Sequence, residues 1–320
     1  MKLSIIVPVY NCKDKIIRLL SSVLSSDAEF ELICVNDGST DNTVSIIESF
    51  HDRRLVVYSK ENQGTFKTWQ YGLSKASGDY VTIFDQDDYV DSDCIDVIFR
   101  LIEENSADVF FSPYYFEKED GTKKPGHLPF KEGLYKDKEL ETIRPVLLSG
   151  RVPYAKFSKV IRKEVLQDQV MNTYSGTVTD FEDWLTMIQV FGRISSIYIS
   201  NRAYYHYILY SNTNSVSKST RSYRKNFNSL LTMVDFLQES TYVRLNSEKI
   251  DMIYFYACRI LLNKCIKIKE FSLARQILHD ERFERGLKKA NIPKYEKLLL
   301  SMKKANIYYC CYLLKKMLGN

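Results

Sequence analysis

The first 84 residues alternate between short apolar runs and amphipathic stretches, and this alternation restricts the fold more than any other feature of the chain. The first run is apolar almost throughout, as expected of a strand that is buried on both faces. Strands joined by helices predict an α/β fold, with a mostly parallel sheet flanked by helices. In such a sheet, ligands bind beyond the carboxyl ends of the strands. The predicted strands are 3–9, 31–35, 55–58 and 80–84, and the helices between them are 15–24, about 42–50 and 64–76.

The remainder of the chain divides into a mixed part and a helical part. We predict a helix at 92–105, a strand at 109–116, a loop or hairpin at 117–135 and a helix at 138–149. After Ser219 the apolar pattern is helical throughout.

Charge follows the same division. Residues 221–320 contain 20 Lys and Arg against 9 Asp and Glu, whereas the preceding 220 residues contain 25 against 31. Two interpretations of the basic C-terminal helices stay open. They form a bundle that packs on the first part, or they make a peripheral contact with an anionic membrane surface. No motif supports binding to nucleic acid.

Composition excludes several classes of protein. The 320-residue chain is 45% hydrophobic and 27% charged, which is typical of a globular protein and not of a disordered one. No apolar stretch approaches the roughly 18 residues of a membrane-spanning helix, and the first residues indicate a strand and not a signal peptide. Seven cysteines without a C-x-x-C spacing favour a reduced, cytoplasmic compartment. The four histidines are too scattered to predict a zinc site.

Polar residues follow the first two predicted strands. The sequence PVYN follows the first, and the G-x-G-x-x-G motif of a dinucleotide-binding fold is absent there. The sequence NDGSTD follows the second, where it forms either a turn with a helix cap or part of a ligand site. Ser39, Thr40 and Asp41 are the candidate caps.

The fourth predicted strand is followed by Asp85, Gln86, Asp87 and Asp88. Carboxylates this close repel one another unless a positive charge neutralises them, and hard oxygen ligands suit Mg²⁺ or Mn²⁺. An EF-hand is excluded because Val90 stands where that loop requires glycine. The alternative is a solvated acidic turn that caps the helix beginning near residue 92.

Several motifs, taken in their order along the chain, resemble those of a known protein family. They are SIIVPVYN, ELICVNDGSTD, ENQGTFKTWQYGLSKASGDYVTIFDQDD and FEDW. Together they resemble the family 2 glycosyltransferases, an inverting group with the GT-A fold. The resemblance is dense over 1–100, clear again at 154–216, and faint beyond about 220.

The resemblance implies a fold and a domain division. The fold is GT-A, a Rossmann-like, mostly parallel sheet flanked by helices, with a helical C-terminal extension. The catalytic domain spans 1–219, with a nucleotide-sugar part at about 1–110 and an acceptor part at about 111–219. Residues 220–320 form the helical C-terminal region.

The resemblance also implies roles for the polar loops. The loops after the first two strands hold the nucleotide base, and the D-x-D element after the fourth lies at the ribose and the diphosphate. Asp87, with Asp85, would ligate Mn²⁺ or Mg²⁺, while Asp88 is expected to cap the next helix more readily than to join the metal. The nucleotide-sugar-binding residues so implied are Pro8, Tyr10, Asn11, Asp37, Gly64, Asp85 and Gln86.

A later acidic segment, DFEDW at 180–184, resembles the family's E-D motif. Inversion needs one carboxylate to take the acceptor's proton, and Asp183 occupies that position. Glu182, Trp184 and Lys159 would contact the acceptor or support its loop. For Lys159, contact with phosphate and a place on the surface are the alternatives. The alternative for Glu182 and Asp183 is an acidic helix N-terminus that the helix dipole favours. His206, in YYHY, is expected to pack beside its tyrosines and not to act in catalysis.

These observations predict a metal-dependent enzyme that moves a sugar from a UDP- or dTDP-linked donor to a hydroxyl of a saccharide or lipid-linked acceptor with inversion. Surface polysaccharide synthesis in the cytoplasm, at the inner face of the membrane, is the expected setting. The alternatives are a non-catalytic sugar-binding or scaffolding relative and a nucleotidyltransferase of the same fold class. The nucleotidyltransferase lacks support because the G-x-G-T-R-type loop is missing after the first strand.

Overall fold

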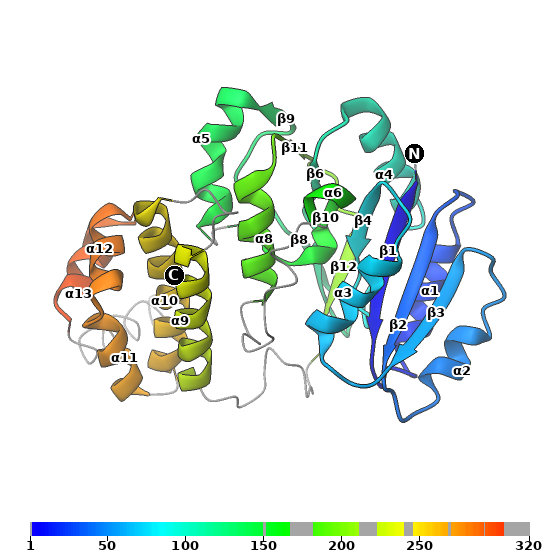
Figure 1. The fold of residues 1–320 in the computed structure, drawn as a ribbon, viewed down its shortest axis with the longest axis horizontal. Helices are drawn as coiled ribbons and strands as arrows, with labels where there is room; N and C mark the ends of the chain where they lie inside the picture. The colour runs from blue at the N-terminus through cyan, green and yellow to red at the C-terminus, as the bar shows by residue number, and fades with distance from the viewer. Residues whose placement is uncertain are drawn as a thin grey trace. The chain divides into compact units, whose positions relative to one another are not determined.

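A computed structural model describes residues 2–149, 152–166, 182–210, 223–239, 246–267, 270–290 and 292–303. They belong to two compact units (Figure 1). The first unit takes the described residues up to Arg144, from Val152 to Leu166, and from Arg193 to Tyr210, and the second takes the others. No helix in these ranges is long and apolar enough to cross a bilayer.

The first unit is built on an eight-stranded sheet, which confirms the predicted α/β class. Strands β1 to β4 are parallel to one another, while β10 runs antiparallel to both of its neighbours. All seven residues of β1 are buried, because strands flank it on both edges and helices cover both faces. The order is β3 (Leu55–Lys60), β2 (Glu31–Asp37), β1 (Leu3–Val9), β4 (Tyr80–Ile83), β10 (Lys159–Arg162), β6 (Val109–Phe111), β11 (Ser196–Ile199) and β9 (Gly133–Lys136).

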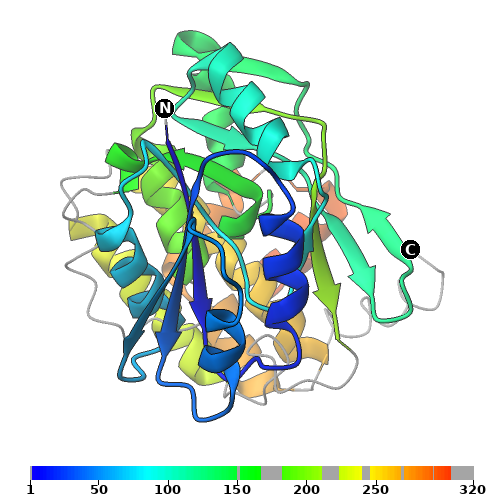
Figure 2. The same cartoon turned by 90° about the vertical axis from the view of Figure 1, so that its right-hand side faces the viewer.

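Successive side chains of β1 point to opposite faces of the sheet. The odd-numbered positions, such as Val7, share one apolar core with α1 (Ile16–Leu24) and α4 (Cys94–Asn105). Ile6 faces α3 (Thr65–Lys75) instead, so closely that a Cβ on Gly72 would lie 2.5 Å from the Ile6 Cγ2 atom. Figure 2 shows the dark blue α1 and the blue-cyan α3 on opposite sides of the strands. The short helix α2 (Thr43–Glu48) lies between β2 and β3 in the chain.

A second, four-stranded sheet corrects one prediction. The strand expected at 109–116 is two strands, β6 in the large sheet and β7 (Tyr115–Lys118) in the small one. Pro113 lies between them, and proline cannot donate to a strand ladder. The predicted hairpin contains the antiparallel pair of β7 and β8 (Lys123–Pro125). The small sheet runs β5 (Tyr89–Val90), β12 (Tyr205–Leu209), β7 and β8.

The helix predicted at 138–149 is α5 (Asp137–Leu148), and its residues up to Arg144 belong to the first unit. Just before β10 and just after it lie a 3₁₀ turn (Lys156–Ser158) and α6 (Lys163–Leu166).

The second unit is helical in all its described parts, as the pattern after Ser219 predicts. Helix α10 is central, with Tyr254, Phe255 and Cys258 fully buried. It meets α12 at Gly286, where a Cβ would lie 2.3 Å from the Asp251 carbonyl oxygen. The helices are α8 (Glu182–Arg193), α9 (Tyr223–Glu239), α10 (Ser247–Lys267), α11 (Phe271–Leu278), α12 (Glu281–Lys289) and α13 (Lys294–Ser301).

Candidate active site

The acidic loop, Asp85–Asp88, follows β4 at the carboxyl end of the parallel strands. Gln86 joins it to the loop after β1. Its Oε1 atom accepts a hydrogen bond from the Tyr10 backbone N–H at 2.7 Å, and its Nε2 atom donates to the Tyr10 carbonyl at 3.2 Å. The two loops that the sequence assigns to the diphosphate and the base are therefore in direct contact.

Asp85 and Asp87 differ in their surroundings. Desolvation by the protein raises the pKa of Asp85 to about 6, against the opposing charge of Lys156 and with support from the negative charge of Asp87. The Asp87 side chain is 36% exposed, and its Oδ2 atom lies 3.4 Å from the Lys15 ammonium. Asp87 is thus the carboxylate of this loop that a soluble ligand reaches most easily.

The prediction that Asp88 caps the following helix is wrong. Its Oδ2 atom accepts a hydrogen bond from the Tyr205 hydroxyl at 2.8 Å, and its Oδ1 atom accepts one from the Ile208 N–H at 2.8 Å. The N-cap of α4 is Asp93, whose side chain makes no capping bond. Burial, and then the charges of the neighbouring carboxylates, raise the pKa of Asp88 well above its ordinary value. Asp88 therefore fastens the acidic loop to β12.

Two tyrosines extend this attachment. The Tyr205 hydroxyl, fully buried, also accepts a hydrogen bond from the Asp85 N–H at 3.0 Å. The Tyr210 hydroxyl, just beyond β12, donates to the Asp87 carbonyl at 2.9 Å. The backbone of the acidic loop is consequently fixed without any ligand.

Helix α1 brings two cations to the same loop. The Arg18 guanidinium donates to the Asp87 carbonyl at 2.9 Å and lies 3.1 Å from the Tyr210 hydroxyl. The Lys15 ammonium lies 3.6 Å from the centre of the Tyr210 ring. Lys15 and Arg18 stand one helical turn apart, so they project from one face of α1.

Asp37 ends β2 and organises the loop that follows β3. Its Oδ1 atom accepts hydrogen bonds from the Lys60 ammonium and from the Gln63 N–H at 2.9 Å, and its Oδ2 atom accepts one from the Gly64 N–H at 2.8 Å. Burial alone would raise the pKa of Asp37, but these bonds outweigh it and hold the pKa below its ordinary value. Gly64 begins α3 with φ 86° and ψ 162°, a conformation that only glycine adopts readily.

The loop after β1 is also tied to the loop after β2. Asn11, with φ 45°, donates its N–H to the Ser39 hydroxyl at 3.0 Å and accepts the Thr40 N–H on Oδ1 at 2.8 Å. Pro8 is buried within β1, while the Tyr10 ring is 45% exposed. In the loop after β1, Tyr10 is therefore the residue whose aromatic ring a base can reach.

The helix after this loop begins later than the sequence suggests. The Asp41 Oδ1 atom accepts the Thr43 N–H at 3.0 Å, but the N-cap of α2 is Asn42, which makes no side-chain capping bond. Ser39 and Thr40 bond to Asn11, as described above, and so they are not caps either.

Asp85 and Asp87 are the carboxylates that fit a divalent cation, because both oxygens of Asp88 are bonded to β12. Within the described ranges, no group of three or more His, Cys, Asp or Glu side chains is arranged to hold a metal ion. Two carboxylates still suit Mg²⁺, which proteins commonly bind through one or two carboxylates together with substrate phosphates. The residues present therefore fit a cation that arrives with a diphosphate.

The predicted acceptor side lies on other elements. Glu182 and Asp183 form the first turn of α8 in the second unit, and Trp184 beside them is 1% exposed. Asp180 and Phe181 of the same motif lie outside the described residues.

Lys159 is neither a surface residue nor free to bind phosphate. It is fully buried, and its ammonium donates to the Pro153 and Ala155 carbonyls, each at 2.8 Å, and to the Ser158 hydroxyl at 2.9 Å. Burial lowers the pKa of Lys159 well below its ordinary value. Its place in the structure is that of a support for the loop before β10.

His206 packs beside tyrosines, as expected. Its ring stacks between Tyr89 and Tyr115, with ring centres 4.2 and 4.8 Å away. Its two nitrogens also contact carboxylates, Nδ1 with Glu117 at 2.8 Å and Nε2 with Asp91 at 2.9 Å. These contacts hold the small sheet together.

Comparison with known proteins decides the family. The model of the family described as glycosyl transferase family 2 matches residues 4–168, about half of the chain. The chain belongs to glycosyl transferase family 2.

Relatives of this family 2 glycosyltransferase occur in several bacteria. It is 28% identical over 180 residues to the glycosyltransferase GlyA of Streptococcus pneumoniae, and this match covers 51% of this chain and 26% of GlyA. It is also 28% identical over 214 residues to the poly(ribitol-phosphate) β-N-acetylglucosaminyltransferase TarS of Staphylococcus aureus, covering 64% of this chain and 35% of TarS. The matches thus span about a quarter to a third of these relatives.

The structure of the glycosyltransferase resembles that of S. aureus TarS residues 1–349 in complex with UDP-GlcNAc. The TM-score is 0.69 at 21% identity, over 97% of this chain and 90% of that one. This similarity confirms the GT-A fold with a helical C-terminal region.

Several residues at the acidic loop of this glycosyltransferase were not predicted from the sequence. Lys15 and Arg18 could have been noticed as basic residues at helical spacing directly after the first polar loop. Lys156, Tyr205 and Tyr210 carry no local signal, because they reach Asp85 and its neighbours from segments about 70 to 125 residues away.

Proposed function

We propose that this family 2 glycosyltransferase is inverting and metal-dependent, and that it moves a sugar from a UDP- or dTDP-linked donor to a hydroxyl of a saccharide or lipid-linked acceptor. One observation carries the proposal. Gln86 joins the loop of Asp85 and Asp87 directly to the Tyr10 loop, so the proposed cation-binding and base-binding residues would form one continuous site. We further propose a role in surface polysaccharide synthesis. The proposed cytoplasmic setting is supported by the five free cysteines of the described residues.

The proposed donor follows from the base side of the site. Asp37 is held in its charged form, and a charged carboxylate accepts the ring N–H of uracil or thymine. Both Asp37 oxygens are bonded within the protein, so the base would have to share an oxygen with the Gln63 or Gly64 N–H. Tyr10 provides the exposed ring for stacking on the base. The relative TarS is described with UDP-GlcNAc, which supports a uridine nucleotide here without identifying the sugar.

The proposed metal role rests on Asp85 and Asp87, which would hold Mn²⁺ or Mg²⁺. Such a cation, when bound, neutralises the charge of a departing nucleoside diphosphate. The protein's own contribution is to fix the backbone that carries the two carboxylates, through Tyr205 of β12 and Tyr210 just beyond it, before the donor arrives. Lys15 and Arg18 add positive charge beside Asp87, where the diphosphate would lie.

Asp183 is the proposed general base, supported by its place in the family motif and in the first turn of α8. It would take the proton of the acceptor hydroxyl as that oxygen attacks the anomeric carbon from the face opposite the diphosphate, which produces inversion. Glu182 would contact the acceptor, and Trp184, being buried, would support the helix.

A screen of nucleotide sugars for release of UDP or dTDP, with and without Mn²⁺, tests this function. We expect Asp183→Asn to retain donor binding and lose transfer, and Asp87→Ala to lose metal-dependent binding. Normal transfer by Asp183→Asn would refute the base assignment. A response only to a nucleoside triphosphate with a sugar phosphate would instead identify a nucleotidyltransferase, and sugar binding without turnover would identify a scaffolding relative.

A further inference from the structure

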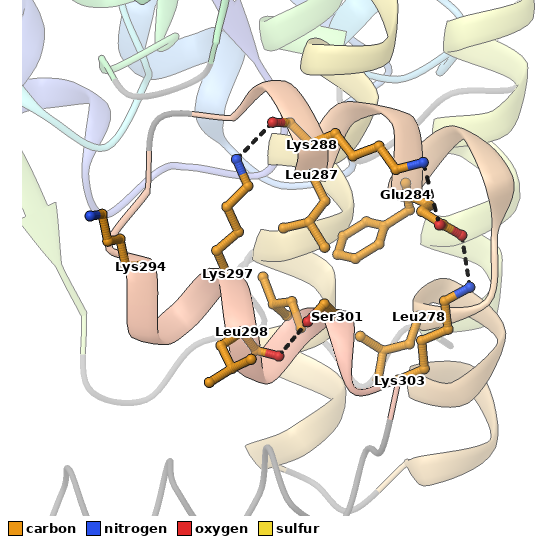
Figure 3. Close-up of a pocket in the computed structure, with 11 residues that line it drawn as sticks. Leu278, Glu284, Leu287, Lys288, Lys294, Lys297, Leu298, Ser301 and Lys303 are labelled. Carbon is orange, nitrogen blue, oxygen red and sulfur yellow. Dashed lines mark hydrogen bonds and ion pairs between the residues drawn. The ribbon is translucent and has the colours of Figure 1, made fainter.

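A pocket of about 340 Å³ opens in the second unit, lined by α12, α13 and the end of α11 (Figure 3). The apolar part of its lining is formed by the buried side chains of Leu278, Phe283, Leu287 and Leu300. The rest of the lining is Leu298, Ser301, four lysines and a single acidic residue, Glu284, so that the pocket is strongly positive. The lysines are Lys288, Lys294, Lys297 and Lys303.

An exposed apolar stripe lies beside this pocket. Tyr295, Leu298 and Met302 are 56%, 64% and 45% exposed, and they account for three of the eight large apolar side chains exposed in the described ranges. Their spacing of three and four residues places them on one face of α13 and its C-terminal end. Leu298 also lines the pocket, so stripe and pocket form a continuous surface.

The acidic residues near this surface do not neutralise it. Glu284 is shared between Lys303 at 2.7 Å and Lys288 at 3.6 Å. Glu296, the acidic residue of α13, is 9% exposed and pairs with Arg259 at 2.9 Å. Lys297 donates to the Lys288 carbonyl, a contact that leaves its charge uncompensated. Helix α13 therefore presents lysines and apolar side chains outward while its acidic side chain is turned inward.

We propose that this surface, the α12–α13 pocket with the Tyr295–Leu298–Met302 stripe, docks the protein on a membrane that contains acidic phospholipid. An acyl chain would contact the apolar lining and the stripe, and the phosphate would lie among the lysines. Exposed apolar side chains flanked by lysines are the features by which a helix binds in the interfacial plane of an anionic bilayer.

Charge distinguishes this occupant from the chain's own C-terminal segment. Residues 304–320 contain three lysines and no acidic residue, so a lysine-lined pocket would repel them. A second copy that docked through the same surface would likewise bring lysines against lysines. An acidic lipid matches both the charge and the apolar character of the surface, and the proposal is independent of the transfer reaction.

Co-sedimentation of the full chain with phosphatidylcholine vesicles, with and without phosphatidylglycerol, tests the proposal. We expect binding only when phosphatidylglycerol is present, and weaker binding at high salt. The double variant Lys294→Gln/Lys297→Gln should bind about thirtyfold more weakly, because each lysine near an anionic surface contributes about a factor of five. The matched control is Lys118→Gln/Lys124→Gln, two exposed lysines of the β7–β8 hairpin, which should bind like the unaltered protein.

Leu298→Asp tests the apolar part, with Val56→Asp on the edge strand β3 as its control. We expect loss of binding in the first and no change in the second, and circular dichroism verifies that each variant is folded. The proposal is overturned if the unaltered protein ignores phosphatidylglycerol, or if the lysine variant and its control bind equally. Equal sedimentation with both vesicle types would also overturn it, as would a Leu298-dependent dimer that binds no vesicles.

Discussion

Replacing Tyr205 by Phe should loosen the acidic loop and leave the fold otherwise intact. The hydroxyl donates to Asp88 at 2.8 Å and accepts from the Asp85 N–H at 3.0 Å, in a place from which solvent is excluded. A hydrogen bond to a carboxylate contributes about 1.5–3 kcal/mol, and a buried N–H left without an acceptor costs about 1–3 kcal/mol. We therefore expect the free energy of unfolding to fall by about 3 kcal/mol, measured by urea denaturation.

The same variant should bind Mn²⁺ with UDP about tenfold more weakly, because residues that hold metal ligands in place typically affect metal affinity by that factor or more. Electron paramagnetic resonance of free Mn²⁺ measures this affinity directly. Tyr80→Phe is the matched control, since its buried hydroxyl donates only to the neutral Ala107 carbonyl at 2.9 Å, at the opposite end of β4. It should lose about 1 kcal/mol and no Mn²⁺ affinity. If Tyr205→Phe matches Tyr80→Phe in both measurements, the reasoning about β12 is wrong.

Three further predictions concern the same site. Because the pKa of Asp85 is raised to about 6, protonation should compete with the metal. Mn²⁺ affinity should therefore be constant above that pH and fall below it, by roughly tenfold per pH unit at the low end. A calorimetric affinity that stays unchanged from pH 5 to 7 would contradict this. Lys15→Met should strengthen Mn²⁺ binding without nucleotide about two- to fivefold, since an ammonium 3.4 Å from Asp87 is removed, and weaker binding would argue against that competition. Gly64→Ala should lower the free energy of unfolding by about 1–3 kcal/mol, because alanine is strained at φ 86°. Urea denaturation would show this as a lower midpoint, and an unchanged midpoint would show that the loop adapts.

The elements that position the site could be predicted from the sequence because they are local. A strand buried on both faces must be apolar over its whole length, and β1 has the bounds predicted for it. The polar loop that follows a parallel strand must lie at the carboxyl edge of the sheet, which places Asp37 and Asp85 correctly at the ends of β2 and β4.

Contacts between distant segments could not be predicted in this way. Asp88 has the local pattern of a helix cap, but burial against β12 gives it two stronger partners more than 100 residues away. Lysine is normally a surface residue. Only the fold shows that three acceptors of the preceding loop surround the Lys159 ammonium. Spacing in the sequence cannot reveal either arrangement.

The two hydrogen bonds between Gln86 and Tyr10 have a thermodynamic consequence. Any shift of the Tyr10 backbone when a nucleotide stacks there is transmitted to the carboxylates on either side of Gln86. Base recognition and cation affinity should therefore be linked reciprocally, each enhancing the other by an equal factor. With the proposed metal role, such a linkage would let the enzyme acquire its cation together with its donor and release both after turnover.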